Sequence, residues 1–214
     1  MTLSVDLPAG TVQLPSAWSP VTGRGTVVIA HGAGAGMGHP FLVGFADALN
    51  DLGFSTLRFE FAYRAMGRRM QGPAPHAIAA WRAAVAHARA LAPGDRIWAC
   101  GKSYGGRMAS MAVAEGLETD GLIYLGYPLH APGKPEKPRA EHLPAVAVPQ
   151  LFIEGTTDPF VQPREQLEDV ITGCQDARIV WIENANHSFE IRGNKREASV
   201  IGASLAPLVA EFLV

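Results

Sequence analysis

A serine lies between two glycines in the segment GKSYG (residues 101–105), directly after the short apolar run 97–100. The apolar run is typical of a buried strand, and the alanine-rich segment that follows is typical of a helix. The pattern G-x-S-x-G is the nucleophile elbow, a sharp strand-to-helix turn that exposes the hydroxyl, here that of Ser103. The segment also resembles the end of a phosphate-binding P-loop, but that motif requires a glycine where this chain has Arg96. By itself the motif is also compatible with an ordinary glycine-rich turn, so its context decides between these interpretations.

The rest of the chain alternates between strand-like and helix-like segments. We expect strands at residues 2–7, 10–15, 25–30, 55–61, 121–126, 149–154 and 178–182, and helices at 40–52, 75–91, 162–173 and 196–213. This alternation predicts an α/β fold in which a mostly parallel sheet carries helices on both faces. The length of 214 residues predicts a single domain, residues 1–214. Ligands of such sheets bind at the carboxyl ends of the strands.

Charge and composition argue against several classes of function. A net charge of −2 gives no support for binding nucleic acid or an anionic membrane. No apolar run is long enough to span a bilayer, and the N-terminal segment lacks the pattern of a signal peptide, so we expect a cytoplasmic protein. The two cysteines, Cys100 and Cys174, form neither a disulfide framework nor a metal-ligand pattern. We therefore expect no metal and no cofactor.

The glycine-rich segment HGAGAGMGH (residues 31–39) follows the first buried strand. One interpretation is a dinucleotide site, with Glu60 at the end of the next strand as the ribose-binding acid. The fingerprint G-x-G-x-x-G fails here, however, because its third glycine position falls on Met37 or on His39. The alternative is a loop that brings backbone N–H groups close to the Ser103 hydroxyl.

That second interpretation assigns a role to particular backbone groups. In a nucleophile-elbow protein, an oxyanion is bound by the N–H of the residue after the serine, here Tyr104, and by one N–H from the loop after the early strand. Ala33 fits the second position, and the neighbouring Gly34 is a candidate for substrate contact. His31 is expected to be a structural hydrogen-bonding residue, and His39 is expected to start a helix.

Two further polar residues follow the last two predicted strands. Asp158 lies in a turn after the strand 149–154, and His187 lies in the loop after the final strand. The order serine, acid, histidine is the one that this arrangement of strands requires. Glu154 is the rival acid, but its place at the end of a strand directs it along the sheet. For Lys102, next to the serine, we expect an ion pair with Glu60 or with Glu154.

Three segments together resemble a known family: residues 31–41, 58–61 and 101–110. They are similar to a small dienelactone-hydrolase-like group of the α/β-hydrolase family, whose eukaryotic relatives include a testis-expressed protein and a subunit of a histone-acetyltransferase complex. The resemblance covers nearly the whole chain. It implies an α/β-hydrolase fold with a minimal or absent lid, and a small-molecule acyl substrate.

The resemblance also implies the roles of three residues: Ser103 as nucleophile, Asp158 as acid and His187 as base. Dienelactone hydrolases themselves use cysteine as nucleophile, so the serine in this chain argues against a lactone substrate. The expected reaction is hydrolysis of a small or exposed carboxylic ester or thioester through an acyl-enzyme. Because fold does not determine function, a non-catalytic binding or scaffold protein on a hydrolase fold is the second interpretation.

The sequence contains few indications of the substrate. Only a short proline-rich stretch, residues 129–138, stands where larger relatives insert a helical lid, which suggests an open site. Arg64, Arg68 and Arg69 follow the strand 55–61 and would lie on the side of the sheet that carries the site. They are candidates for binding an anionic substrate; a solvated basic loop is the alternative that needs no ligand.

Overall fold

The fold is built on an eight-stranded sheet in the order β1-β2-β4-β3-β5-β6-β7-β8. The computed structural model describes residues 1–213. The strands from β4 to β8 in this order pair in parallel, while β1 and β2 are antiparallel additions at one edge. Their bounds are β1 Thr2–Leu7, β2 Gly10–Ser19, β3 Thr26–Ala30, β4 Ser55–Phe59, β5 Ile97–Lys102, β6 Gly121–Leu125, β7 Gln150–Gly155 and β8 Ala177–Ile182. The predicted fold class is confirmed.

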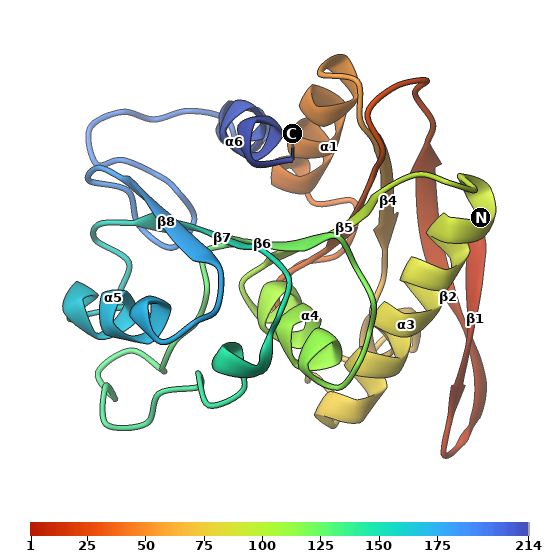
Figure 1. Cartoon of the computed structure of the whole chain (residues 1–214), viewed down its shortest axis with the longest axis horizontal. Helices are drawn as coiled ribbons and strands as arrows, with labels where there is room; N and C mark the ends of the chain where they lie inside the picture. Colours follow the sequence, from red (N-terminus) through yellow and green to blue (C-terminus); the bar gives the residue numbers. More distant parts are fainter. Residues whose placement is uncertain (214) are drawn as a thin grey trace.

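Helices cover both faces of the sheet (Figure 1). One face carries α1 (Pro40–Asp51) and α6 (Ala198–Phe212), and the other carries α3 (Ala74–Leu91), α4 (Tyr104–Ala114) and α5 (Arg164–Thr172). The buried apolar side chains accordingly form two clusters, one on each face. The inner strands β3, β5, β6 and β7 bury residues on both faces, which is why they read as continuous apolar runs.

The largest differences from the expected elements lie near the antiparallel edge. The second strand was expected to end at Pro15 but continues to Ser19, because its first part pairs with β1 and its second part with β4. Proline lacks an N–H, and Pro15 stands opposite Thr2 at the end of the pairing with β1, where the ladder passes to β4. The segment after β4 was expected to be a loop and contains the short helix α2 (Ala62–Ala65).

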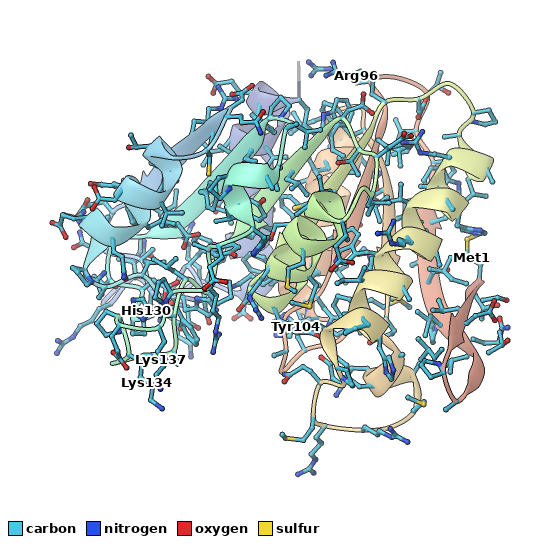
Figure 2. All side chains as sticks on the ribbon, turned by 60° about the horizontal axis from the view of Figure 1, so that its bottom comes forward. Met1, Arg96, Tyr104, His130, Lys134 and Lys137 are labelled. Atoms are coloured by element: carbon cyan, nitrogen blue, oxygen red, sulfur yellow. The ribbon has the colours of Figure 1, made fainter. Side chains whose placement is uncertain are left out.

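Because the inner strands are parallel, their carboxyl ends meet at one edge of the sheet. Figure 2 shows this direction: Arg96, before β5, lies at the opposite end of the sheet from Tyr104, after β5. Lys134 and Lys137, in the connection from β6 to β7, lie toward the same end as Tyr104. The loops after β3, β5, β7 and β8 therefore gather around one place, where ligands of such sheets bind.

The connection from β6 to β7 forms no helical lid. Within residues 126–149 the only helix is the single 3₁₀ turn η1 (Leu143–Ala145). Leu129, Leu143 and Val146 from this connection are buried in the core on the α3 and α4 face. Among the helices of residues 1–213, none has the length and apolar character needed to cross a membrane.

Candidate active site

Ser103 stands at the turn from β5 to α4 in a strained backbone conformation. Its φ of 50° and ψ of −116° are unusual for a residue with a side chain, and such a conformation costs about 1–3 kcal/mol. The flanking glycines make the tight turn sterically accessible. A Cβ on Gly101 would lie 2.1 Å from the backbone nitrogen of Gly106, and one on Gly105 would lie 2.7 Å from the carbonyl oxygen of His31. The sequence pattern thus reflects close contact between β5, α4 and the loop after β3.

Three residues from three loops form one hydrogen-bonded chain at this edge. The Nε2 atom of His187 lies 2.9 Å from Ser103 Oγ, and its Nδ1 atom lies 2.5 Å from Asp158 Oδ2. Asp158 is fully buried, and its other oxygen, Oδ1, accepts the N–H of Phe160 at 2.8 Å. The Phe160 ring lies over the imidazole with 4.2 Å between the ring centroids. The structure therefore brings together the three residues that the sequence order suggested.

The hydrogen bonds determine which nitrogen of His187 carries the proton. An ionised carboxylate only accepts, so the Nδ1–H donates to Asp158 and Nε2 is left to accept the hydroxyl of Ser103. Burial lowers the pKa of His187 below its ordinary value, the bond to Asp158 opposes this effect, and the charge of Lys102 adds to it. The imidazole is therefore neutral at pH 7, as a general base must be.

The loop after β3 is held in place by polar side chains. His31 is fully buried: its Nδ1 faces the Gly32 carbonyl at 2.7 Å, and its Nε2 accepts the N–H of Phe61 at 3.2 Å. The hydroxyl of Tyr63 donates to the Ala33 carbonyl at 2.8 Å. His31 thus serves as a structural hydrogen-bonding residue that supports the loop after β3.

Two residues at the end of β4 hold the far part of the same loop. Glu60 Oε1 accepts the N–H of Met37 at 2.9 Å, and Arg58 Nη1 donates to the Met37 carbonyl at 2.8 Å. His39 then begins α1, since its side chain accepts the N–H of Phe41. Glu60 and Arg58 thus both hold the backbone of Met37 in place.

Of the two backbone donors named from the sequence, Tyr104 directly follows Ser103, and Ala33 lines the same pocket as Ser103. Tyr104 is the first residue of α4, so its N–H is one of the donors that a helix leaves without an internal partner. Within residues 1–213, no turn, loop or side-chain hydrogen bond uses the N–H of Ala33 or of Tyr104. Both groups are therefore available to an acceptor placed beside the serine.

A pocket of about 490 Å³ opens at Ser103 and His187. Its polar end contains the glycine loop, including Ala33 and Gly34, together with Lys102 and Glu190. Its apolar walls come from the two helices of one face: Phe41 and Leu42 from α1, and Ala198 and Ile201 from α6. This geometry offers an apolar compartment next to the hydroxyl.

The arginines proposed from the sequence as substrate contacts lie outside this pocket. None of Arg64, Arg68 and Arg69 lines it. Arg68 borders a separate hollow of about 60 Å³ beside Tyr104, and Arg64 lies close to Gly36 and Glu60 on the outer side of the glycine loop. The turn of α2 directs this segment away from the serine, which sequence spacing did not reveal.

Comparison with known proteins identifies the family. The family model described as an alpha/beta hydrolase domain matches residues 23–210. The chain belongs to the α/β-hydrolase family. In this hydrolase Ser103 stands at the turn from β5 to α4, and the mostly parallel sheet agrees with the fold of the family.

Solved structures show the same fold for the α/β hydrolase over its full length. An alpha-beta serine hydrolase homologue from Coxiella burnetii superimposes with a TM-score of 0.75 at 20% identity, covering 100% of this chain and 97% of that one. A dienelactone hydrolase from Anabaena variabilis gives 0.74 at 24% identity, with 99% and 94% covered. A lidless α/β serine hydrolase from Xanthomonas campestris gives 0.73 at 22% identity, also with 99% and 94% covered.

One interaction in this hydrolase differs from the sequence-based expectation. Lys102 forms an ion pair with neither Glu60 nor Glu154; its Nζ donates to the carbonyl oxygen of His187 at 2.7 Å. Glu154 is fully buried in β7, where it accepts the N–H of Tyr127.

The apolar pocket walls were also missed. Phe41 and Ile201 carry no motif, and only their amphipathic helices mark them as buried. The α1 and α6 helices are separated by more than half of the chain, so their approach to the serine appears only in the folded protein.

Proposed function

We propose that this α/β hydrolase is a serine hydrolase that cleaves a carboxylic ester or thioester with a small or exposed acyl group. The observation that carries the proposal is the hydrogen-bonded chain from Ser103 through His187 to Asp158, with distances of 2.9 and 2.5 Å, at the end of an apolar pocket. Nucleophile and base within hydrogen-bond reach, with the base oriented by a third group, is the arrangement that activates a serine.

The chemistry follows from these contacts. Ser103 Oγ attacks the carbonyl carbon while its proton passes to His187 Nε2, and Asp158 stabilises the resulting imidazolium. The N–H groups of Tyr104 and Ala33 donate to the oxyanion. Collapse expels the alcohol or thiol, which takes the proton from His187. Water then attacks the acyl-enzyme by the same route, releasing the acid and restoring the serine.

The pocket walls suggest the acyl group. Phe41, Leu42 and Ile201 present apolar surface beside the serine, and the connection over residues 126–149 places no helix above them. A short aliphatic or compact aromatic acyl chain fits this compartment, with Gly34 as a backbone contact. We assign no substrate contact to Arg64, Arg68 or Arg69, because all three lie outside the pocket.

The test combines a covalent probe with turnover. Purified protein is treated with a fluorophosphonate, and hydrolysis of p-nitrophenyl acetate, butyrate and octanoate is measured in parallel. Stoichiometric labelling of Ser103 together with turnover supports the proposal. A folded protein that neither reacts with the probe nor hydrolyses any of the esters would contradict it.

Filling the apolar compartment should change the preference for chain length. Ile201→Trp adds volume at the α6 wall, so the ratio of kcat/KM for butyrate over acetate is expected to fall by about 10-fold, as the free energy of burying the extra methylenes, about 0.8 kcal/mol each, is lost. The measurement is ester hydrolysis across the acyl series. Val200→Trp, at an exposed position on the same helix, serves as the control. An unchanged ratio in Ile201→Trp would place the acyl group elsewhere.

The activity should depend on pH through His187. Burial is the main cause that lowers the pKa of His187 below its ordinary value of about 6.5. The neutral imidazole therefore already predominates at pH 6.5. Because the neutral form is the active one, kcat/KM is expected to rise with pH through this lowered pKa and to level off before pH 7. A profile of kcat/KM from pH 4.5 to 7.5 measures it. A flat profile, or a midpoint above 6.5, would argue against His187 as the base.

A further inference from the structure

Lys102 lies behind the imidazole, and the mechanism described above does not use it. Its Nζ donates to the backbone carbonyl of His187 at 2.7 Å, and its ammonium lies 5.4 Å from the ring centroid of Phe189, two residues further on. The side chain therefore bridges from the end of β5 to the loop after β8. It is half-buried and lines the Ser103 pocket.

The end of β6 is shaped around this contact. Gly126 has a φ of +73°, and a Cβ built on it would lie 3.0 Å from Lys102 Nζ and 3.4 Å from two atoms of the His187 ring. A side chain there would press on both groups. Glycine at this position thus allows the ammonium and the imidazole to lie side by side against the strand end.

Several charges face the ammonium. Burial lowers the pKa of Lys102 to about 8, while the nearby Asp158 and Glu154 act in the opposite direction. Burial raises the pKa of Glu154 well above its ordinary value, although the hydrogen bond from the Tyr127 N–H acts in the opposite direction. Glu190 lines the same pocket. Asp158 acts on both Lys102 and His187, and a pKa of about 8 leaves Lys102 largely protonated at pH 7.

We propose that Lys102 is a positioning residue for His187: its hydrogen bond to the His187 carbonyl anchors the histidine loop, and its ammonium, held beside the imidazole, adds to the effect of burial in disfavouring the imidazolium. A cation beside an imidazole disfavours the imidazolium, whereas Asp158 alone would favour it. Burial and the charge of Lys102 together oppose the effect of Asp158, so His187 is oriented by Asp158 yet unprotonated at neutral pH. The role of Lys102 in catalysis rests on the proposed function, whereas its effect on the pKa and position of His187 does not.

Three substitutions separate the two contributions. Lys102→Met keeps the apolar stem and removes both the donor and the charge, Lys102→Gln keeps an N–H donor without the charge, and Lys102→Arg keeps both. The first measurement is the pKa of His187 from NMR titration of its ring, which needs no substrate. The second is the pH profile of kcat and KM with p-nitrophenyl butyrate. Lys137→Met, in the connection from β6 to β7, is the control (Figure 2).

The expected result is a rise in the pKa of His187 by about half a pH unit or more in Lys102→Met and Lys102→Gln, and none in Lys102→Arg or Lys137→Met. The acidic limb of kcat/KM should move by the same amount. Loss of the anchor in Lys102→Met should lower kcat about 10-fold with little change in KM, and Lys102→Gln should recover part of that loss.

A folded Lys102→Met or Lys102→Gln protein whose His187 titrates as in the wild type would overturn the proposal. Lys102→Gln retains a polar head group, so its His187 pKa can test the proposal even if Lys102→Met does not fold. If His187 titrates as expected but wild type turns over no ester, the coupling of Lys102 to His187 is upheld and the proposed hydrolase activity fails. The two ideas are thereby tested separately.

Discussion

Ser103→Ala is expected to eliminate fluorophosphonate labelling and to lower kcat/KM for p-nitrophenyl butyrate by about 10⁴- to 10⁶-fold. The substitution removes the only atom that can form the acyl-enzyme, while the pocket and the N–H groups of Ala33 and Tyr104 stay in place. The backbone at position 103 has a φ of 50°, which alanine adopts about as poorly as serine, so the fold should persist. Labelling, burst kinetics and steady-state turnover measure the effect.

The exposed Ser4 on β1 provides the matched control, since Ser4→Ala removes a hydroxyl far along the sheet from the site. Both variants should show the same thermal unfolding midpoint within a few degrees. Turnover that survives in folded Ser103→Ala at more than about one hundredth of the wild-type rate would assign the chemistry to another nucleophile, because the residual rate from binding and oxyanion contacts is far smaller.

Asp158→Asn is expected to lower kcat by about 10⁴-fold with much less effect on KM. The reason lies in the two hydrogen bonds of the carboxylate. The Phe160 N–H requires an acceptor at Oδ1, so the new amide must turn its NH₂ toward His187 Nδ1. That nitrogen must then accept, and the imidazole takes the tautomer with Nε2 protonated. This tautomer cannot take the proton from Ser103, so kcat with saturating ester reports the loss.

Asp169→Asn on α5 is the control for this prediction, because Asp169 is exposed and takes no part in the hydrogen bonds that join Ser103, His187 and Asp158. NMR of the imidazole protons should show the Nε2–H tautomer in Asp158→Asn and the Nδ1–H tautomer in Asp169→Asn. A fully active Asp158→Asn would mean that another residue, with Glu154 the nearest rival in the chain, orients the base.

Much of the fold could be predicted from local patterns. The strands β3, β5, β6 and β7 are short apolar runs because both of their faces are covered, and the helices between them begin and end at proline, histidine and glycine signals. The edge was less predictable. The length of β2 depends on two partners distant in sequence, β1 and β4, and no local pattern reports a strand that changes partners.

The candidate site shows the same division. Ser103, Asp158 and His187 could be named from one motif and from the order of loops, because parallel strands bring every following loop to one edge. The arginine segment shows the limit of this reasoning. It follows β4 at that edge, yet Arg64 on α2 and the two later arginines, Arg68 and Arg69, do not line the pocket. Which way a loop turns depends on packing rather than on spacing.

The sequence by itself therefore determined the layered α/β architecture, the turn at Ser103 and the set of residues that could meet at the strand ends. These follow from hydrophobic periodicity and from the small residues that tight turns require, both of which are local properties. Only the tertiary structure decided the apolar walls from α1 and α6, the exclusion of the arginines and the bond from Lys102 to the His187 carbonyl. Each of these contacts joins distant parts of the chain, and its geometry is set by how whole elements pack against the sheet.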